Sequence, residues 1–224
     1  MCASYGLQIT AEDIHYGFSV IDDRSSMVAL SGWLEEFRDE AAKPTGVNRR
    51  NLNPIIRERE KAGEHRRTVD LAWWKLWIGK APAKFPAINA RVEGLVGSGA
   101  WGAPLKSRRA LVPATEYYEK GHRFELPDEP NGLFAFAGLW NVAKTSDPTT
   151  GDDEWMLSYA IVTQPASSHI ASIHDRMPLI LPRDLYDEWL DPERVGDQNL
   201  LDDVVAESRS VSERLKISEG TSPR

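Results

Sequence analysis

Apolar residues recur along this chain at helical spacing in several places. Four large apolar residues fall at i, i+3, i+4 and i+7, the spacing of a single helix face: Leu30, Trp33, Leu34 and Phe37. Pro44 follows, so the pattern predicts a helix over residues 25–40. Further amphipathic helices are predicted at 181–191 and 197–208. A short helix is predicted at 165–173, since proline suits a first helical turn.

Other segments have the β-prone residues and flanking turn signals of strands. Residues 109–119, 133–142 and 154–164 are apolar or aromatic. The last two are separated by a turn-rich segment that contains Pro148 and Gly151, which predicts a hairpin. The polar, basic segment 45–67 suits a loop that enters a strand or turn. Together these elements predict a mixed α+β fold with a strand-rich core.

Length and composition favour one soluble domain. The chain has 224 residues, 41% hydrophobic and 27% charged, which is ordinary for a globular protein with its own core. No internal repeat or convincing linker interrupts it, so we expect one domain over residues 1–218 and a loose tail over 219–224. Neither a signal peptide nor a run long enough to span a membrane is visible, which predicts a cytoplasmic protein.

Charge is unevenly distributed along the sequence. The formal net charge is −7, yet residues 43–109 contain 15 Lys and Arg against 5 Asp and Glu. A basic region on an acidic protein can bind phosphates locally while the remainder repels duplex DNA. A second interpretation stays open, in which these charges are dispersed over several faces of the molecule.

The single cysteine, Cys2, directly follows Met1. One cysteine excludes an internal disulfide and a cysteine-rich zinc site. Once Met1 is removed, an amine and a thiol lie on adjacent carbons, and this pair converts an aldehyde into a Schiff base and then a thiazolidine ring. An α-amine has a pKa of about 8, so roughly a tenth of it is unprotonated at pH 7. Position alone also allows that Cys2 has no chemical role.

Four other segments place polar side chains within apolar runs: Asn89–Arg91, Arg108–Glu119, Ile161–Ala166 and Ile173–Ile180. Taken singly, each is typical of ordinary structure. Glu119 suits a solvated strand end, His174 suits a structural turn, and Asn89 suits a turn as well. Only their combination with Cys2 indicates a function.

That combination resembles the SOS-response-associated peptidase (SRAP) domain family. The family begins Met-Cys-Gly-Arg and carries three motifs in order: Asn-Ala-Arg, Pro-Ala-x-x-(Phe/Tyr)-Tyr-Glu and His-Asp-Arg-Met-Pro. Here they are Asn89–Arg91, Pro113–Glu119 and His174–Pro178. Phe136–Trp140 resembles the family's Phe-Ala-Gly-Leu-Trp strand, and Asn51–Pro54 resembles its Asn-x-Ala-Pro loop. The resemblance implies a single domain with a barrel-like mixed β core flanked by short helices.

The resemblance also implies a chemistry, the covalent capture of abasic sites in single-stranded DNA. Cys2 would form the thiazolidine with the ring-opened sugar, and Asn89 would hold the terminal residue and the sugar. Glu119 would transfer protons and assist removal of Met1. His174 would protonate the sugar oxygen, or the leaving group if the cross-link reverses. No cofactor or metal is implied, and the expected state is a monomer that associates with the nucleoid when bound to DNA.

Further residues are expected to contact the DNA. Arginines would bind phosphates, tryptophans would stack on bases, and a threonine would orient a neighbour. The candidates are Arg49, Arg50, Trp74, Trp77, Arg91, Arg108, Arg109, Thr163 and Arg176. The tryptophans could equally belong to the core.

The sequence departs from the family pattern at three places. Ala3 and Ser4 stand where the family has Gly-Arg, which removes one expected phosphate contact. The Arg-Trp-Gly-Leu-x-Pro-x-Trp segment is altered over Ala72–Trp77, and Lys120 replaces the usual tryptophan after Glu119. Two other functions remain open: an amide hydrolase with Cys2 as N-terminal nucleophile, and a non-catalytic domain that binds DNA or protein.

Overall fold

The computed structural model describes residues 4–21, 24–44, 52–61, 63–78, 81–146 and 153–223. Five strands close into a barrel in the order β11-β3-β2-β7-β10 and back to β11. They are β2 (Leu52–Lys61), β3 (Glu64–Trp74), β7 (Arg109–Ala114), β10 (Phe134–Ser146) and β11 (Asp153–Pro165). Only the pairing of β3 with β11 is parallel among these five.

Short strands extend the barrel. Two of them, β6 (Asn89–Arg91) and β12 (Arg176–Pro178), pair with β11, whereas β13 (Ile180–Leu181) pairs with β10. A small pair, β4 (Trp77–Ile78) and β5 (Ala81–Pro82), lies beside β10. The predicted α+β class with a barrel-like mixed core is therefore confirmed, and so is the hairpin formed by β10 and β11.

A second sheet contains four strands in the order β1-β8-β9-β14. They are β1 (Tyr5–Gly6), β8 (Glu116–Glu119), β9 (His122–Glu125) and β14 (Lys216–Glu219). Only Thr115 separates β7 of the barrel from β8 of this sheet. The predicted strand over 109–119 is thus two strands in two sheets.

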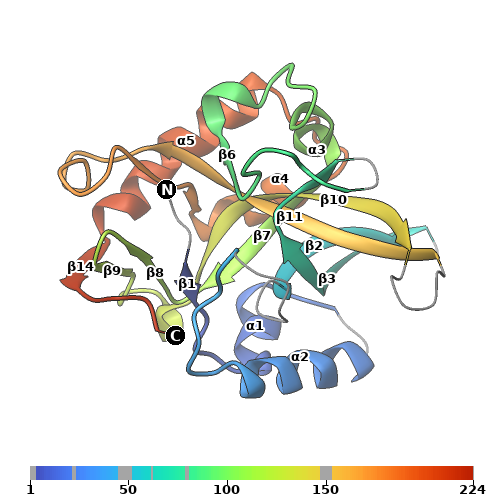
Figure 1. The fold of residues 1–224 in the computed structure, drawn as a ribbon, viewed down its shortest axis with the longest axis horizontal. Coiled ribbons are helices and arrows are strands. Elements are labelled where there is room, and N and C mark those ends of the chain that lie inside the picture. The colour runs from blue at the N-terminus through green and yellow to red at the C-terminus, as the bar shows by residue number, and fades with distance from the viewer. Residues whose placement is uncertain are drawn as a thin grey trace.

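Three of the helices are short, and α2 and α5 are longer (Figure 1). The helices are α1 (Ala11–Gly17), α2 (Arg24–Glu36), α3 (Gly102–Ser107), α4 (Tyr186–Leu190) and α5 (Gln198–Glu213). Single 3₁₀ turns occur at Val92–Gly94, Pro130–Gly132 and Arg183–Leu185. Helix α1 begins with a capping box between Thr10 and Asp13, and Asp197 caps α5. No helix in the described ranges is long and apolar enough to cross a membrane.

The alternation of side chains along the barrel strands builds two cores. Ile56 and Leu111 pack with residues of α1, α2, α4 and α5 in one core. Ile55 and Val112 face the other way and pack with Tyr117 and Phe124 of the small sheet. Because neighbouring residues of a strand point to opposite faces, the barrel wall separates the two cores, and among the helices α5 reaches the second core through Val211.

Two predicted helices differ from the structure. Residues 168–173 form turns, and Pro165 still belongs to β11, opposite Arg176. The segment predicted as a helix at 181–191 starts in β13 and becomes helical only as a 3₁₀ turn and α4. The helix predicted at 25–40 is shorter, as α2, and the one at 197–208 is longer, as α5. Of the segment 45–67, residues 45–51 and 62 lie outside the described residues, Gly63 is in a turn, and the rest belongs to β2 and β3.

Candidate functional site

Glu119 and His174 face each other across the two sheets. Glu119 ends β8, and His174 precedes β12, yet its Nε2 lies 3.8 Å from Glu119 Oε1. Both side chains are largely buried, with 14% of the Glu119 side chain and 16% of the His174 side chain exposed. A carboxylate and an imidazole in such proximity can exchange a proton with each other and with a bound group.

The other nitrogen of His174 indicates its neutral tautomer. The backbone N–H of Arg176 donates to His174 Nδ1 at 2.9 Å, and an N–H can only donate. In this arrangement Nδ1 carries no proton, so the proton of a neutral His174 is on Nε2, facing Glu119. Asp175 Oδ1 lies 2.8 Å from the same Nδ1 and is mostly exposed, so it suits the charged imidazolium. The Arg176 N–H therefore suits the neutral imidazole, and the Asp175 carboxylate suits the charged one.

Asn89, Arg91 and Thr163 meet where β6 joins β11. Asn89 pairs with Ile161 and Arg91 with Thr163 in parallel register. Thr163 is fully buried, and its Oγ1 has no hydrogen-bond partner in the part of the chain that the structure describes. Arg91 is exposed and Asn89 is buried. The register thus assembles three of the predicted side chains on one edge of the barrel.

The N-terminal strand runs along β8 toward this edge. Tyr5 pairs with Tyr117, and the backbone N–H of Tyr118 donates to the carbonyl of Ser4 at 3.0 Å. Ser4, the first described residue, is therefore held next to Tyr118, one position before Glu119. Cys2 lies outside the described residues, as do Arg49 and Arg50.

The buried carboxylate of Glu116 holds the N-terminal segment against the small sheet. Glu116 is 2% exposed, and four side chains donate hydrogen bonds to it. The donors are Thr115 Oγ1 at 2.9 Å, Gln8 Nε2 at 3.3 Å, the Tyr118 hydroxyl at 3.2 Å and an Arg123 guanidinium nitrogen at 3.4 Å. Burial, together with the charge of Glu116, raises the pKa of Tyr118 to about 12. The network joins the segment after β1 to both β8 and β9.

Gly6 leaves room for this carboxylate, so Gly6→Ala should destabilise the protein. A Cβ at position 6 would overlap Glu116 Oε1, and overpacking of this kind costs about 1–3 kcal/mol in free energy of unfolding. In a Glu116→Ala background the obstacle is absent, and the same change should cost less than about 1 kcal/mol. Urea denaturation of the unaltered chain, the two single variants and the double variant measures this coupling.

Gly32 provides the matched control for that experiment. It lies at an exposed position of helix α2, where an added Cβ would meet nothing within 4 Å, so Gly32→Ala should stabilise by about 0.5–1 kcal/mol. Equal costs of Gly6→Ala with and without Glu116 would show that the two residues do not interact.

The C-terminal segment closes one side of the site. A pocket of about 280 Å³ is lined by Glu119 and Lys120 on one side and by Gly220 to Ser222 on the other. The hydroxyls of Ser4 and Ser222 share a hydrogen bond, and Lys43 Nζ donates to the carbonyl of Pro223 at 2.8 Å. Ser4 therefore contacts the end of the chain at the position where the family motif has arginine.

Two of the expected DNA contacts, Trp74 and Arg176, are bonded within the fold, and two others, Trp77 and Arg108, are half-buried. Trp74 is fully buried, and its indole N–H donates to the carbonyl of Ile88 at 3.0 Å, so it packs in the core rather than against bases. Trp77 is half-buried beside β10. Arg176 holds both carboxylate oxygens of Glu93 and donates to the carbonyl of Thr163 at 2.9 Å. Arg108 is half-buried, and burial lowers its pKa.

Arg109 is the clearest such case. It is 2% exposed, and burial lowers its pKa to about 10. Its guanidinium donates to the carbonyls of five residues: Leu105, Lys106, Trp189, Asp191 and Arg194. Arg109 is thus enclosed within the fold, where it joins α3 to α4 and to the segment after α4.

The basic segment 43–109 is partly neutralised within the fold. Asp70 pairs with Arg57 at 2.8 Å and with Arg59 at 3.2 Å. Arg67 pairs with Glu58 at 3.0 Å and with Asp187 at 2.7 Å. Asp70 and Glu58 are already among the 5 acidic residues of this segment, so of these pairs only the one with Asp187 lowers its positive excess. Among the described residues, no group of three or more His, Cys, Asp or Glu side chains is suited to hold a metal ion.

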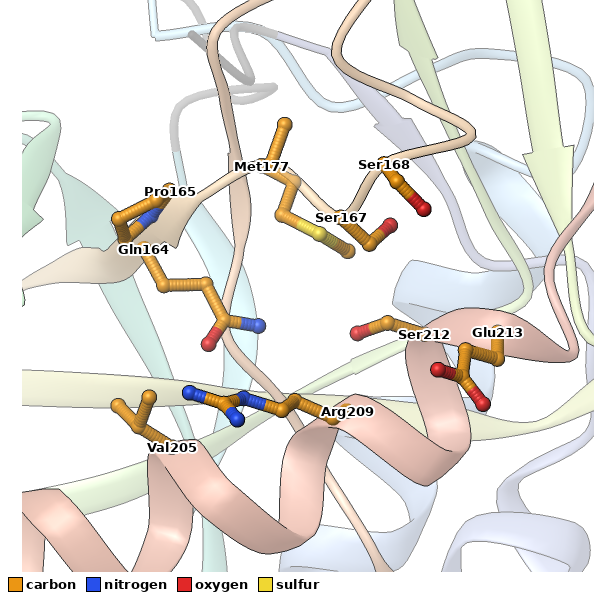
Figure 2. Close-up of a pocket in the computed structure, with 10 residues that line it drawn as sticks. Gln164, Pro165, Ser167, Ser168, Met177, Val205, Arg209, Ser212 and Glu213 are labelled. Carbon is orange, nitrogen blue, oxygen red and sulfur yellow. The ribbon is translucent and has the colours of Figure 1, made fainter.

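A separate cavity of about 320 Å³ lies between α5 and the loop after β11. Figure 2 shows Gln164 and Met177 on one side of it and Arg209 and Ser212 on the helix. Gln164 adjoins Thr163 in the same strand, so the two side chains point to opposite faces. The described candidates Asn89, Glu119 and His174 do not line this cavity, which therefore lies behind the site.

Comparison with known proteins finds a family match over nearly the whole chain. The model of the SOS response associated peptidase (SRAP) family matches residues 1–219. The abasic site processing protein YoaM of Bacillus subtilis is 30% identical over 159 residues, which are 67% of this chain and 66% of that protein. The abasic site processing protein YoqW of the same organism is 29% identical over 192 residues, covering 82% and 81%.

A solved structure supports the fold. The crystal structure of a protein from Bacteroides thetaiotaomicron matches with a TM-score of 0.69 at 18% identity, over 97% of this chain and 91% of that one. At this identity the likeness concerns the fold alone.

Proposed function

Since the chain belongs to the SOS response associated peptidase family, we propose that it processes abasic sites in DNA, the activity named for its Bacillus relatives. In detail, Cys2, freed by removal of Met1, captures the sugar aldehyde of an abasic site in single-stranded DNA. The observation that carries this proposal is the Glu119–His174 pair beside the N-terminal strand. The protein acts as a monomer without a cofactor.

The capture reaction balances with the loss of one water. The α-amine of Cys2 adds to the aldehyde carbon, and the resulting carbinolamine loses water to give a Schiff base. The Cys2 thiol then adds across the C=N bond, its proton passes to nitrogen, and the thiazolidine ring closes. A lysine Schiff base has no second nucleophile with which to close such a ring.

Glu119 and His174 supply the proton transfers. Glu119 accepts a proton from the attacking amine and returns it to the departing water, which is general acid–base catalysis. His174, as the imidazolium that Asp175 faces, donates its Nε2 proton to the sugar oxygen as the ring opens and is left as a neutral imidazole. The same Glu119 carboxylate assists the hydrolytic removal of Met1.

Three residues of the β6–β11 edge orient the substrate. The Asn89 amide both donates and accepts, which suits a sugar hydroxyl and an amine. The buried Thr163 hydroxyl has capacity for a further hydrogen bond. Arg91, exposed next to Thr163 in the register, suits a flanking phosphate. Arg176 acts here through Glu93 and Thr163, to which it is already bound.

Chain length permits Cys2 to reach this pair. Cys2 is two positions before Ser4 in the sequence, and an extended residue spans about 3.3–3.6 Å. Ser4 is bonded to Tyr118, the neighbour of Glu119. A terminus within about 7 Å of Ser4 is compatible with contact between the Cys2 amine and the Glu119 carboxylate.

The test is denaturing electrophoresis of protein incubated with single-stranded DNA that carries one abasic site. We expect a slow-migrating, heat-stable product from the unaltered chain. Cys2→Ser should give none, because a hydroxyl closes a less durable ring, although borohydride should still trap its Schiff base. An absence of product with verified abasic DNA, or an equal yield from Cys2→Ser, would reject the mechanism. Hydrolysis of a small amide in its place would favour an N-terminal-nucleophile hydrolase.

A further inference from the structure

One face of the β10–β11 hairpin continues outward from the candidate site. In this hairpin Trp140 pairs with Tyr159, Val142 with Leu157, and Lys144 with Trp155. Residues two apart in a strand share a face, so these six side chains lie on the same side. Figure 1 shows β10 and β11 extending together beyond the rest of the barrel. We call this side the hairpin face.

The strand pairing gives the distance over which the hairpin face extends from the candidate site. Asn89 pairs with Ile161 of β11, at the inner end. With a rise of about 3.3 Å per residue, the Trp140–Tyr159 pair lies about 7 Å from that point and Trp155 about 20 Å from it. Aromatic and apolar side chains therefore follow one another from the site to the outer end of the hairpin.

Exposure increases in the same direction. Tyr159 is fully buried, and Trp140 and Leu157 are partly buried. Val142 is 43% exposed and Trp155 is 66% exposed. The opposite face is covered, since Ala143 is buried and Asn141 Nδ2 donates to the carbonyl of Trp77 in β4 at 2.9 Å. The hairpin face is thus the open side, and a tryptophan this exposed indicates a binding surface.

Arginines accompany the aromatic residues. The guanidinium carbon of Arg57 lies 4.4 Å from the centre of the Trp140 ring, in a cation–π contact. Arg59, two residues further along β2, has a side chain that is 51% exposed. Both arginines share the single carboxylate of Asp70, which leaves one positive charge in excess. Exposed Lys144 adds another cation on the hairpin face.

We propose that the hairpin face binds the single-stranded DNA that flanks the captured lesion, with Trp155 stacking on a base. The inference rests on the proposed function and names the surface that the substrate strand follows. Aromatic platforms interleaved with cations, in continuity with the site, are how proteins bind single strands. The exposed cations Arg59 and Lys144 beside the aromatic residues favour a strand that carries phosphates.

The test uses fluorescence anisotropy with a labelled single-stranded oligonucleotide that contains no abasic site, so binding is read without cross-linking. Trp155→Ala should weaken binding about 5- to 100-fold, the effect of losing one stacked base. Trp155→Phe should restore most of the affinity. Tyr16→Ala is the matched control, because Tyr16 is 79% exposed on α1, away from the hairpin, and its loss should change nothing.

The second readout is the rate of capture for oligonucleotides with the lesion at one end or the other. With abasic oligonucleotides that extend only 5′ or only 3′ of the lesion, Trp155→Ala should slow capture for one polarity only. Equal affinity of Trp155→Ala and the unaltered chain for intact single-stranded DNA would overturn the inference. The inference would also be overturned if the only effect of Trp155→Ala, measured by light scattering, were a change in oligomeric state. Failure of the proposed function would give a different result, because the unaltered chain itself would then form no adduct with abasic DNA.

Discussion

The variant Glu119→Gln is expected to capture abasic sites roughly 10²–10⁴ times more slowly than the unaltered chain. Glutamine keeps the size and hydrogen-bonding shape of the side chain but cannot accept a proton at neutral pH. Glu119 lies 3.8 Å from His174, so the variant keeps the fold while losing the proton exchange between them. Quenched-flow sampling followed by denaturing electrophoresis measures the rate of adduct formation.

Glu125→Gln is the matched control for that comparison. Glu125 lies on the neighbouring strand β9 and is paired with Arg123 at 3.0 Å, with 27% of its side chain exposed. Its replacement removes one carboxylate from the same sheet without touching His174. Rates that fall equally in both variants, or in neither, would remove Glu119 from the proposed chemistry.

The largest effect on stability is expected from Arg109→Met. This change withdraws one donor from each of five carbonyls, of which that of Lys106 keeps the Gly196 N–H. Each buried carbonyl left without a donor costs about 1–3 kcal/mol. We expect the free energy of unfolding to fall by more than about 3 kcal/mol in urea denaturation at neutral pH.

Arg66→Met serves as the comparison. Arg66 forms one exposed ion pair with Glu64 at 3.0 Å, and surface substitutions of this kind change stability by about 0.5 kcal/mol or less. If Arg109→Met folds as stably as Arg66→Met and binds DNA more weakly, Arg109 would belong to the nucleic-acid surface after all.

Periodicity predicted the elements whose patterns extend over many residues. The β10–β11 hairpin follows from two long β-prone runs around a turn-rich segment, and α5 follows from its amphipathic spacing. Residues 165–173 show where local signals fail. Pro165 resembles a helix start, yet its pairing with Arg176 keeps it in a strand. Long-range pairing of this kind leaves no signal in a short window.

The candidate site was predictable as a set of side chains but not as a network. The spacing of Glu119 and His174 in the sequence does not indicate that they meet. They meet because the chain leaves the small sheet after β9, forms β10 and β11 of the barrel, and then returns to the end of β8 at His174. Glu116 was missed, since a carboxylate within an apolar run looks like the solvated residue of an alternating strand. The one residue in the sequence that could have indicated a buried Glu116 is Gly6, because a side chain at position 6 would overlap the Glu116 carboxylate.

Arginines were the least predictable residues. Arg108 and Arg109 look alike in the sequence, and both suited a phosphate. Tertiary structure separates them, because carbonyls of α4 and of the segment after it converge on Arg109. Trp155 was not predicted as a DNA contact, for the converse reason. A tryptophan within a β-prone run is usually buried, and only the register shows that this one lies beyond the barrel.

Mass spectrometry of the product tests the central claim most directly. Protein that has lost Met1 is incubated with an abasic single-stranded oligonucleotide, and the intact mass and proteolytic fragments of the adduct are measured. The proposed reaction requires the sum of the two masses less one water, with the nucleotide on the N-terminal peptide at Cys2. An adduct on a lysine, or full retention of Met1 in protein that still forms the adduct, would contradict it.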